Sequence, residues 1–371
     1  MTGNPDPIST DLFTGARWFA GKQHDLERVE RRATIFAADG ATVELVAAVA
    51  TAGEDEYLLP LRDGRECDGT DPLWPALARA AGFAACAATG FLADDLSNTV
   101  VVLDEHAVLK LYRRPAPGPH PEPVALRALA SSPHAPSLLG ELRHGDATVL
   151  VVQELVAGDP VGWEELIMRL AQGDPASGDP AALAETTAHL HRTLAAELGT
   201  TEVTLDVSAG PLTGELADLK PRVAEVLASL AARGPVSAQR IHGDLHVAQF
   251  LRAPDRFVVV DWEGEPGKSL GERARPLPPA RDLGSLRLSL AHAARAAHRH
   301  NPDFDWRAWS TAARREALHA YEAASGPVDP VLLHALEIAK ELDELDYAAR
   351  YLPEWLYAPT AVLPFILEEA A

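Results

Sequence analysis

Two short segments near the middle of the chain carry the residue types that phosphoryl transfer from ATP requires. Residues 242–249 read His-Gly-Asp-Leu-His-Val-Ala-Gln, and residues 261–265 read Asp-Trp-Glu-Gly-Glu. Such transfer depends mostly on positioning and on charge neutralisation, for which a hydroxyl-activating base and a magnesium site are the main parts. Asp244 in the first segment is the predicted catalytic base, because a carboxylate can accept the proton of an attacking hydroxyl.

A second carboxylate follows 17 residues after this base, at the end of an apolar, strand-like run. Magnesium prefers few protein oxygen ligands together with substrate phosphates, and an Asp with a nearby Gln can supply them. We therefore predict Gln249 and Asp261 as magnesium ligands, with Glu263 adding a water-mediated contact or holding a second metal ion. Zinc is not expected, since no third His or Cys lies at a usual spacing from His242 and His246, which we expect to brace the loop.

One lysine upstream can neutralise the phosphates of ATP. Lys110 lies in the run Val-Leu-Lys-Leu-Tyr, where strand alternation sends its side chain to the face opposite Leu109 and Leu111. Polar residues before this strand can offer backbone N–H groups and hydroxyls to phosphate oxygens, and a hinge-like Gln-Glu-Leu follows it. No GxGxxG or GxxxxGK[ST] pattern stands nearby. The further predicted ATP contacts are Ser97, Asn98, Thr99, Gln153, Glu154 and Leu155.

Composition narrows the class of protein. The 371 residues suffice for two or three domains, 47% of them are apolar as in soluble globular proteins, and the net charge is −21. This charge argues against nucleic acid or an anionic membrane as the main partner. No apolar run of transmembrane length and no signal peptide are visible, and Cys67 and Cys86 cannot form a disulfide framework. A cytoplasmic protein is expected.

The order of elements predicts an α+β fold in three parts. Residues 1–90 are expected to form a cap with strands 28–36, 42–49 and 56–61, turns at Asp39-Gly40 and Gly53-Glu54-Asp55, and a helix over 73–88. Residues 91–157 are expected to form a β-rich, nucleotide-binding lobe with hairpins 99–112 and 137–153 around a helix from 121 to 130. Residues 158–371 are expected to form a mostly helical lobe, with helices at 162–172, 180–198, 214–233, 283–297, 306–324 and 328–352.

The last predicted helix offers an acceptor-binding face. Residues 340, 343, 344 and 347 recur at spacings of three and four, so they share one side of a helix. Polar groups with an aromatic ring suit recognition of sugar hydroxyls, and Trp355 and Tyr357 could add a stacking wall. A solvated face with a Lys340–Glu344 pair is the alternative. The candidate substrate contacts are His246, Lys340, Asp343, Glu344 and Tyr347.

Together these residues resemble a known family. Residues 92–371 resemble the aminoglycoside phosphotransferase-like kinases and, within them, the actinobacterial maltokinases, and residues 17–22 resemble the opening of the maltokinase cap. The matching segments are 96–99, 109–114, 153–154, 239–244 with Gln249, 261–266, 281–282, and Lys340, Glu344, Tyr347, Arg350 and 355–356.

The resemblance implies a bilobal kinase-like fold with an N-terminal cap, and ATP, Mg²⁺ and a sugar acceptor. Maltokinases make maltose 1-phosphate for glycogen-like α-glucan synthesis, and a related branch phosphorylates glucosamine. The family's helix glutamate that pairs with the strand lysine falls on Val124 here, which leaves Glu122 as a shifted candidate. Asp343 and Ala348 stand where Tyr and Glu are expected, a departure that bears on the choice of sugar.

Maltose, phosphorylated at its anomeric hydroxyl, is thus the leading predicted acceptor. Glucosamine or another amino sugar is the alternative, in which Asp343 would meet an ammonium group. An aminoglycoside acceptor and a nucleotide-binding pseudokinase also stay open, the latter because the partner of Lys110 is uncertain. The family resemblance alone makes the cap a candidate docking site for a trehalose–maltose isomerase.

Overall fold

The computed structural model describes residues 8–13, 16, 18–19, 26–50, 53–92, 98–174, 179–205 and 212–369. The chain divides into two compact units, which are described separately. Unit 1 comprises Met1–Arg127 and Pro136–Val156, and unit 2 comprises Ala128–Ala135 and Ala157–Ala371. In the part of the chain that the structure describes, no helix is both long and apolar enough to cross a membrane.

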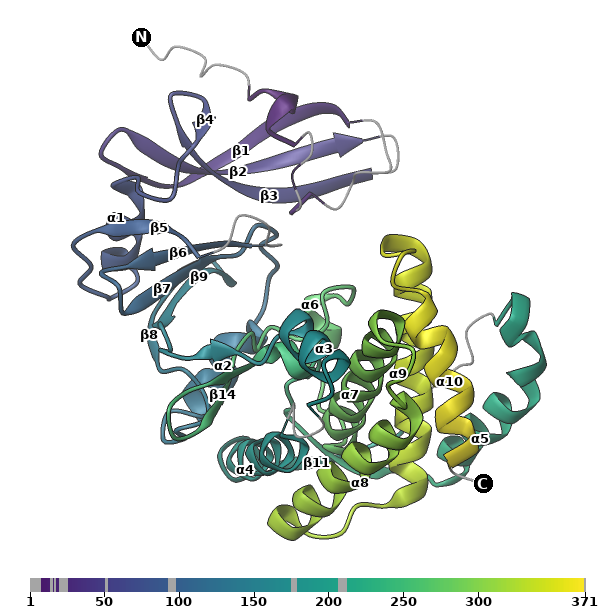
Figure 1. Ribbon diagram of the computed structural model, residues 1–371. Helices are drawn as coiled ribbons and strands as arrows, with labels where there is room; N and C mark the ends of the chain where they lie inside the picture. Colours follow the sequence, from purple (N-terminus) through teal and green to yellow (C-terminus); the bar gives the residue numbers. More distant parts are fainter. Residues whose placement is uncertain are drawn as a thin grey trace. The chain divides into compact units, whose positions relative to one another are not determined.

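The first sheet of unit 1 is an antiparallel meander in the order β1-β2-β3-β4 (Figure 1). Its strands are β1 Leu26–Ala38, β2 Ala41–Ala50, β3 Gly53–Arg62 and β4 Arg65–Glu66, and the short 3₁₀ helix η1 (Thr10–Phe13) precedes them. Asp39 and Gly40 both have positive φ, 51° and 78°, which suits the tight two-residue turn between β1 and β2. β2 is largely buried, which places this strand at the centre of the packing.

The second sheet of unit 1 has the order β5-β6-β7-β9-β8. Its strands are β5 Ala88–Phe91, β6 Thr99–Leu103, β7 Ala107–Leu111, β8 Leu138–His144 and β9 Ala147–Glu154. Helix α1 (Leu73–Ala80) precedes this sheet, and α2 (Pro121–Ala128) connects β7 to β8. All five residues of β7 are buried, so the strand that carries the predicted phosphate-binding lysine is also the centre of the sheet.

One apolar core joins the two sheets of unit 1. It contains buried side chains from the first sheet, from α1 and from the second sheet, among them Val43, Leu58, Trp74, Leu77, Val101, Leu109 and Val152. The first sheet also packs on a smaller cluster of Phe13, Phe19, Val46, Tyr57 and Leu59. Residues of the predicted cap and of the predicted lobe therefore share a core within one compact unit, and the boundary at residue 90 stays a prediction.

Unit 2 is mainly helical. Its helices are α3 Trp163–Ala171, α4 Pro180–Leu198, α5 Lys220–Ala232, α6 Leu270–Arg273, α7 Ala280–His300, α8 Trp306–Ser325, α9 Pro330–Tyr351 and α10 Tyr357–Glu369, with 3₁₀ helices η2 Gly214–Leu219 and η3 Val247–Gln249. Helix α7 packs against α3, α8, α9 and α10. A Cβ on Gly284 of α7 would lie 2.9 Å from Cγ of Glu337 on α9, so the glycine permits this close approach.

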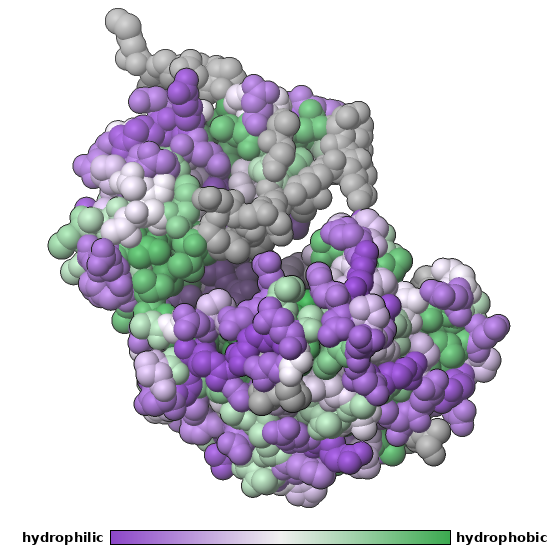
Figure 2. Space-filling view, in the orientation of Figure 1, coloured by the Kyte–Doolittle hydropathy of each residue, from purple (hydrophilic) through white to green (hydrophobic). Residues whose placement is uncertain are grey.

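Two small sheets interrupt the helices of unit 2. β10 (Asp159–Pro160), β13 (Phe250–Arg252) and β14 (Phe257–Val259) form one, and β11 (Thr200–Val203) pairs with β12 (Val236–Gln239) in the other. In the orientation of Figure 1, the surface of this unit is mostly hydrophilic, with apolar residues in separate patches (Figure 2). The predicted mixed α+β class, with a β-rich N-terminal part and a helical C-terminal part, is confirmed.

Some predicted boundaries are wrong. The helix expected over 73–88 ends at Ala80, because Gly82 leaves the helical conformation with a φ of 96°. Residues 53–55, expected to form a turn, begin β3 and pair with 48–50 of β2. The helix expected over 214–233 is split into η2 and α5. Helix α10 was not predicted, because Pro359 and Pro364 conceal its apolar pattern.

Candidate active site

The predicted phosphate-binding lysine of unit 1 has a buried carboxylate partner. Nζ of Lys110 lies 3.0 Å from Oε2 of Glu122 at the start of α2. The Tyr112 hydroxyl donates to the same carboxylate oxygen at 2.6 Å. Both charged side chains are buried, so the pair fixes the lysine by charge and by hydrogen bonding. The partner that sequence placed at Glu122 thus lies within ion-pair distance.

The polar segment before β6 is tied to Arg113. The Thr99 hydroxyl accepts a hydrogen bond from Nε of Arg113 at 2.6 Å, and Oδ1 of Asn98 accepts from the Arg113 backbone N–H at 3.3 Å. Both side chains therefore organise the strand entry, and a phosphate contact here would use backbone N–H groups. Ser97, predicted with them, lies outside the described residues.

The hinge-like segment closes the end of β9. Gln153 is buried, and its side-chain oxygen has no hydrogen-bond partner among the residues that the structure describes. The Glu154 carboxylate accepts from the hydroxyl of Ser137 at 3.0 Å, and the backbone N–H of Leu155 donates to the carbonyl of His106 at 3.0 Å. Of the three predicted ATP contacts in this segment, Gln153 is the one with an unsatisfied side-chain hydrogen-bond acceptor.

In unit 2, one imidazole fixes the loop that carries Asp244. Nδ1 of His242 accepts the backbone N–H of Asp244 at 3.3 Å, so the proton of the neutral ring lies on Nε2. Nε2 contacts the carbonyl oxygen of Val260 at 3.0 Å. His242 therefore ties the Asp244 loop to the residue that precedes Asp261. Gly243, between His242 and Asp244 in the sequence, has a φ of 92°, which glycine adopts without strain.

A buried carboxylate on α7 accepts hydrogen bonds from the backbone of the same loop. Asp282 accepts the backbone N–H groups of His242 at 2.7 Å and Gly243 at 2.9 Å. His191 contacts Asp282 through Nε2 at 3.0 Å and the Tyr321 hydroxyl through Nδ1 at 2.7 Å. Burial alone would raise the pKa of Asp282, but His191 and the N–H of Gly243 bring it below its ordinary value. An ionised, fully buried acceptor therefore sets the backbone of the loop.

The two principal predicted magnesium ligands flank the β13–β14 hairpin at its open end, one before β13 and one after β14. Gln249 precedes β13, and its backbone carbonyl accepts the N–H of Val260 at 2.9 Å. Asp261 follows with a φ of 64°, a left-handed conformation that is uncommon for residues other than glycine. The amide nitrogen of Gln249 faces Nε2 of His246 at 3.3 Å, which leaves its amide oxygen to bind a cation. One carboxylate and one amide oxygen fit Mg²⁺ when substrate phosphates complete its coordination.

Glu263 has different surroundings. Its Oε2 lies 3.4 Å from Nη1 of Arg273, and this guanidinium also donates to the Glu263 backbone carbonyl at 3.3 Å. The residue thus helps to hold the turn after Asp261. Among the described residues, no group of three or more His, Cys, Asp or Glu side chains is arranged to hold a metal ion by itself.

Lys340 of α9 is buried among three carboxylates. Its Nζ lies 2.8 Å from Glu344, 3.3 Å from Asp244 and 3.5 Å from Glu265. Burial alone would lower the pKa of Lys340, but the charges of these neighbours raise it above its ordinary value. The ammonium group therefore persists and donates to Oδ1 of Asp244. From sequence, the pair with Glu344 was the alternative to an acceptor-binding face, whereas the contact with Asp244 depends on the packing of α9 and was not predicted.

A second cation completes this charged cluster. Nη2 of Arg281 lies 3.0 Å from Asp343 and 3.5 Å from Glu265. Burial raises the pKa of Glu344, but Lys340 and His292 lower it below its ordinary value, so this carboxylate is ionised. Carboxylates outnumber cations in the cluster, which consists of Asp244, Glu265, Asp343 and Glu344 with Lys340 and Arg281.

Aromatic rings lie beside this cluster. Trp163, the first residue of α3, stacks on His246 with ring centroids 5.7 Å apart and an interplanar angle of 30°. It meets Trp355 edge-on, also at 5.7 Å. Burial lowers the pKa of His246, so the imidazole stays neutral. Tyr347 is exposed and contacts Tyr351 at 5.1 Å.

Several residues of this arrangement were not among the predicted site residues, Asp282, Glu265, Arg281 and Trp163 among them. Asp282, Arg281 and Glu265 stand in segments that resembled the family, which was their sequence signal. Nothing marked Trp163, because an aromatic residue at a helix start ordinarily packs a core.

Comparison with known proteins assigns the family. A family model described as "Phosphotransferase enzyme family" matches residues 89–286, which span β6, β7, the Asp244 loop and Asp282. The chain belongs to this phosphotransferase family. Two relatives support the assignment beyond this range. A glucosamine kinase of Streptacidiphilus jiangxiensis is 34% identical over 318 residues, covering 74% of this chain and 72% of the relative. A glucosamine kinase of Mycolicibacterium smegmatis is 31% identical over 323 residues, covering 74% and 78%.

Solved structures extend the likeness of this phosphotransferase to nearly the whole chain. A glucosamine kinase crystal structure has a TM-score of 0.74 at 28% identity and covers 99% of this chain and 98% of its own. A glucosamine kinase in complex with glucosamine, ADP and inorganic phosphate has a TM-score of 0.70 at 28% identity and covers 96% and 99%. The prediction of an ATP-dependent phosphotransferase is confirmed.

Proposed function

We propose that this phosphotransferase transfers the γ-phosphoryl group of ATP to a hydroxyl of an amino sugar, with glucosamine as the leading acceptor. The observation that carries the proposal is the excess of carboxylates around Asp244. An ammonium group on the acceptor would supply the missing positive charge, whereas a neutral sugar would leave the excess uncompensated. The two glucosamine kinases that cover most of this chain support the same acceptor.

The side chains have complementary roles in this proposal. Asp244 accepts the proton of the acceptor hydroxyl, and the Lys340 ammonium at 3.3 Å orients that carboxylate and keeps it next to a positive charge. Lys110, fixed by Glu122, neutralises phosphate oxygens of ATP. Gln249 and Asp261 would hold Mg²⁺, which supplies further neutralisation of the phosphates when it is bound.

The amino group of the acceptor is assigned to the α9 side of the cluster. The side chains of Glu344 and Asp343 are 30% and 38% exposed, so both can meet a ligand. Asp343 stands where the maltokinase resemblance predicted a tyrosine, and a carboxylate there favours a cation over a neutral hydroxyl. The stacked rings of Trp163 and His246 offer an apolar surface for the face of a sugar ring.

A disaccharide such as maltose, the leading acceptor from sequence, is the second candidate. The exposed pair Tyr347 and Tyr351 favours it, because these rings continue the Lys340–Glu344 face of α9. Tyr347 follows Lys340 by seven positions, about 10 Å along a helix at 1.5 Å per residue. A second sugar ring could stack there. The comparisons support the amino-sugar alternative better than maltose.

An ADP-release assay over glucosamine, N-acetylglucosamine, glucose, maltose and kanamycin tests the proposal, with the phosphorylated position identified by phosphorus NMR. We expect glucosamine to give the highest kcat/KM and N-acetylation to abolish the preference. Higher kcat/KM for maltose or for glucose would overturn it.

A matched pair of variants on α9 locates the ammonium site. Asp343→Asn should lower kcat/KM for glucosamine about tenfold, the weight of one partly exposed charged hydrogen bond, and leave glucose nearly unchanged. Asp346→Asn is the control, because Asp346 lies on the same helix and pairs with Arg350, four residues further on, at 2.8 Å. Equal effects of Asp343→Asn on both sugars would refute the assignment of Asp343.

The predicted docking of a trehalose–maltose isomerase on the cap stays a prediction. A pull-down with the purified full chain tests it, and retention of that isomerase is the expected result.

A further inference from the structure

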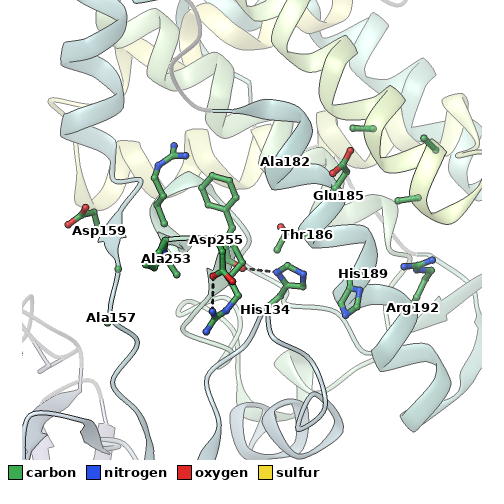
Figure 3. Close-up of a pocket in the computed structure, with 18 residues that line it drawn as sticks. His134, Ala157, Asp159, Ala182, Glu185, Thr186, His189, Arg192, Ala253 and Asp255 are labelled. Atoms are coloured by element: carbon green, nitrogen blue, oxygen red, sulfur yellow. Dashed lines mark hydrogen bonds and ion pairs between the residues drawn. The ribbon is translucent and has the colours of Figure 1, made fainter.

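Unit 2 contains a hollow whose lining includes none of the predicted ATP, metal or acceptor residues. It is a groove of about 1110 Å³ (Figure 3). One wall is a face of α4, and the opposite wall is the β13–β14 hairpin with its connecting loop 253–256. Small side chains of α8, Ala320, Ala323 and Ala324, form a third side and leave the groove wide. Such a volume suits a small organic ligand.

One end of the groove is basic. His189 and Arg192 lie three residues apart on α4, and the His189 ring is 4.9 Å from that of His134, so the three side chains form one cluster (Figure 3). Nδ1 of His134 lies 2.8 Å from the carbonyl oxygen of Phe257 and therefore donates to it, which leaves Nε2 for a ligand. Burial lowers the pKa of His189, and His134 and Arg192 lower it further. An anion at this end would relieve the mutual repulsion of these groups.

The other charged groups of the groove are arranged differently. Arg252 pairs with Asp179 at 2.6 Å and Arg256 with Asp255 at 3.0 Å, so these two arginines are neutralised locally. Glu185 lies one turn before His189 on α4, and Asp159 lies away from the basic cluster in the view of Figure 3. These carboxylates could accept hydrogen bonds from the hydroxyl or amino groups of a ligand whose anionic end binds the basic cluster.

The groove is built from the same elements that fix the catalytic parts. The backbone N–H of Val259 donates to the carbonyl of His134 at 2.8 Å. Gln249 directly precedes β13 of the same hairpin, and Asp261 stands two residues after the end of β14. On α4, His189 and Arg192 flank His191, which contacts Asp282 beneath the Asp244 loop. A ligand that moves the hairpin or α4 would therefore act on the predicted metal ligands.

We propose that this groove binds a small phosphomonoester, such as a sugar phosphate, with its phosphate received by His134, His189 and Arg192, and that occupancy alters the affinity for magnesium nucleotide. Arginine with two imidazoles is a donor set suited to a phosphate dianion, and the protein's overall charge of −21 makes such a basic cluster distinctive. The binding stands without the proposed acceptor. The coupling rests on the metal role proposed for Gln249 and Asp261.

Titration calorimetry on the full chain saturated with Mg–AMP-PNP tests the binding. The probes are glucose 6-phosphate, glucosamine 6-phosphate, AMP and inorganic phosphate. Arg192→Ala and His189→Gln should each weaken the best probe about tenfold. Arg315→Ala, which removes an exposed arginine of α8 outside the groove, is the control and should leave binding unchanged. Asp343→Asn should also have no effect, which separates the groove from the acceptor site.

The outcomes distinguish the sources of the phosphate and the two parts of the proposal. Tighter binding of a sugar phosphate or AMP than of inorganic phosphate identifies an organic ligand, and equal binding identifies free phosphate. Absence of binding by all probes at millimolar concentration, or unchanged affinity in both groove variants, overturns the site. In a second titration, the Kd of Mg–ADP should change about threefold when the best probe is present. An unchanged Kd overturns the coupling.

Discussion

Asp282→Asn isolates the buried carboxylate that holds the Asp244 loop. In the native protein this group accepts three hydrogen bonds, at 2.7, 2.9 and 3.0 Å, from His242, Gly243 and His191. An isosteric amide has one oxygen, so in either orientation its NH₂ group faces a backbone N–H donor. One buried donor then loses its acceptor, at about 1–3 kcal/mol, and the remaining bonds lose charge assistance, at about 1 kcal/mol.

We therefore expect the free energy of unfolding to fall by about 2–4 kcal/mol in this variant. Because the amide repels the backbone that positions Asp244, kcat should fall by about one to two orders of magnitude, as a displacement near 1 Å would cause. Urea unfolding followed by circular dichroism measures the first quantity. ADP release, measured well below the unfolding temperature, gives the second. Asp303→Asn, an exposed aspartate in the α7–α8 loop, should change stability by less than about 0.5 kcal/mol.

The reasoning fails if Asp282→Asn unfolds like the native chain. It also fails if stability falls while kcat stays at the native value, because the carboxylate would then hold the helices together without setting the loop.

Three further outcomes follow from the site. Asp244→Asn should lower kcat about 10²- to 10⁴-fold, with little change in Mg–ATP affinity by calorimetry, and a near-native rate would exclude this residue as the base. Glu122→Ala should lower the free energy of unfolding by about 3–5 kcal/mol, because it removes the carboxylate that pairs with the buried Lys110. A double variant, Lys110→Met with Glu122→Leu, should be more stable than Glu122→Ala; equal or lower stability of the double variant would contradict the role of the pair. Burial lowers the pKa of His246 in the folded protein. Its contribution to stability is therefore fully present above the unfolded pKa of about 6.5 and is lost as the pH falls below that value. The melting temperature of His246→Asn should depend less on pH below about 6.5 than that of the native chain.

Local sequence patterns were sufficient for much of the fold. The predicted helix 180–198 matches α4 residue for residue, because Pro180 starts it and Gly199 ends it. The strands β6 and β7 follow from their apolar runs on either side of Asp104 and Glu105, which adopt positive φ in the turn. Patterns of this kind depend on neighbours in the chain, and the residue types alone reveal them.

The charged interior of the site could not be predicted in the same way. Lys340 was expected on an acceptor-binding helix face, with a solvated face as the alternative; it is 4% exposed and contacts Asp244, 96 residues earlier in the sequence. The role of Asp282 likewise depends on the crossing of α7 beneath the loop. Such contacts arise from packing between distant segments, and no periodicity in either segment records them. The motif at 242–249 and the helix face at 340–347 were recognised separately, and the structure joined them.

The core that unites the two sheets of unit 1 limits how far this chain can be shortened. A version that begins at residue 88 would lose Val43, Leu58, Trp74 and Leu77, and would leave Val101 and Leu109 facing water. The strand that carries Lys110 would then lack support on one side, and exposed β-structure of this kind tends to aggregate. The N-terminal sheet is thus an integral part of unit 1, and a shortened form of this enzyme has to retain it.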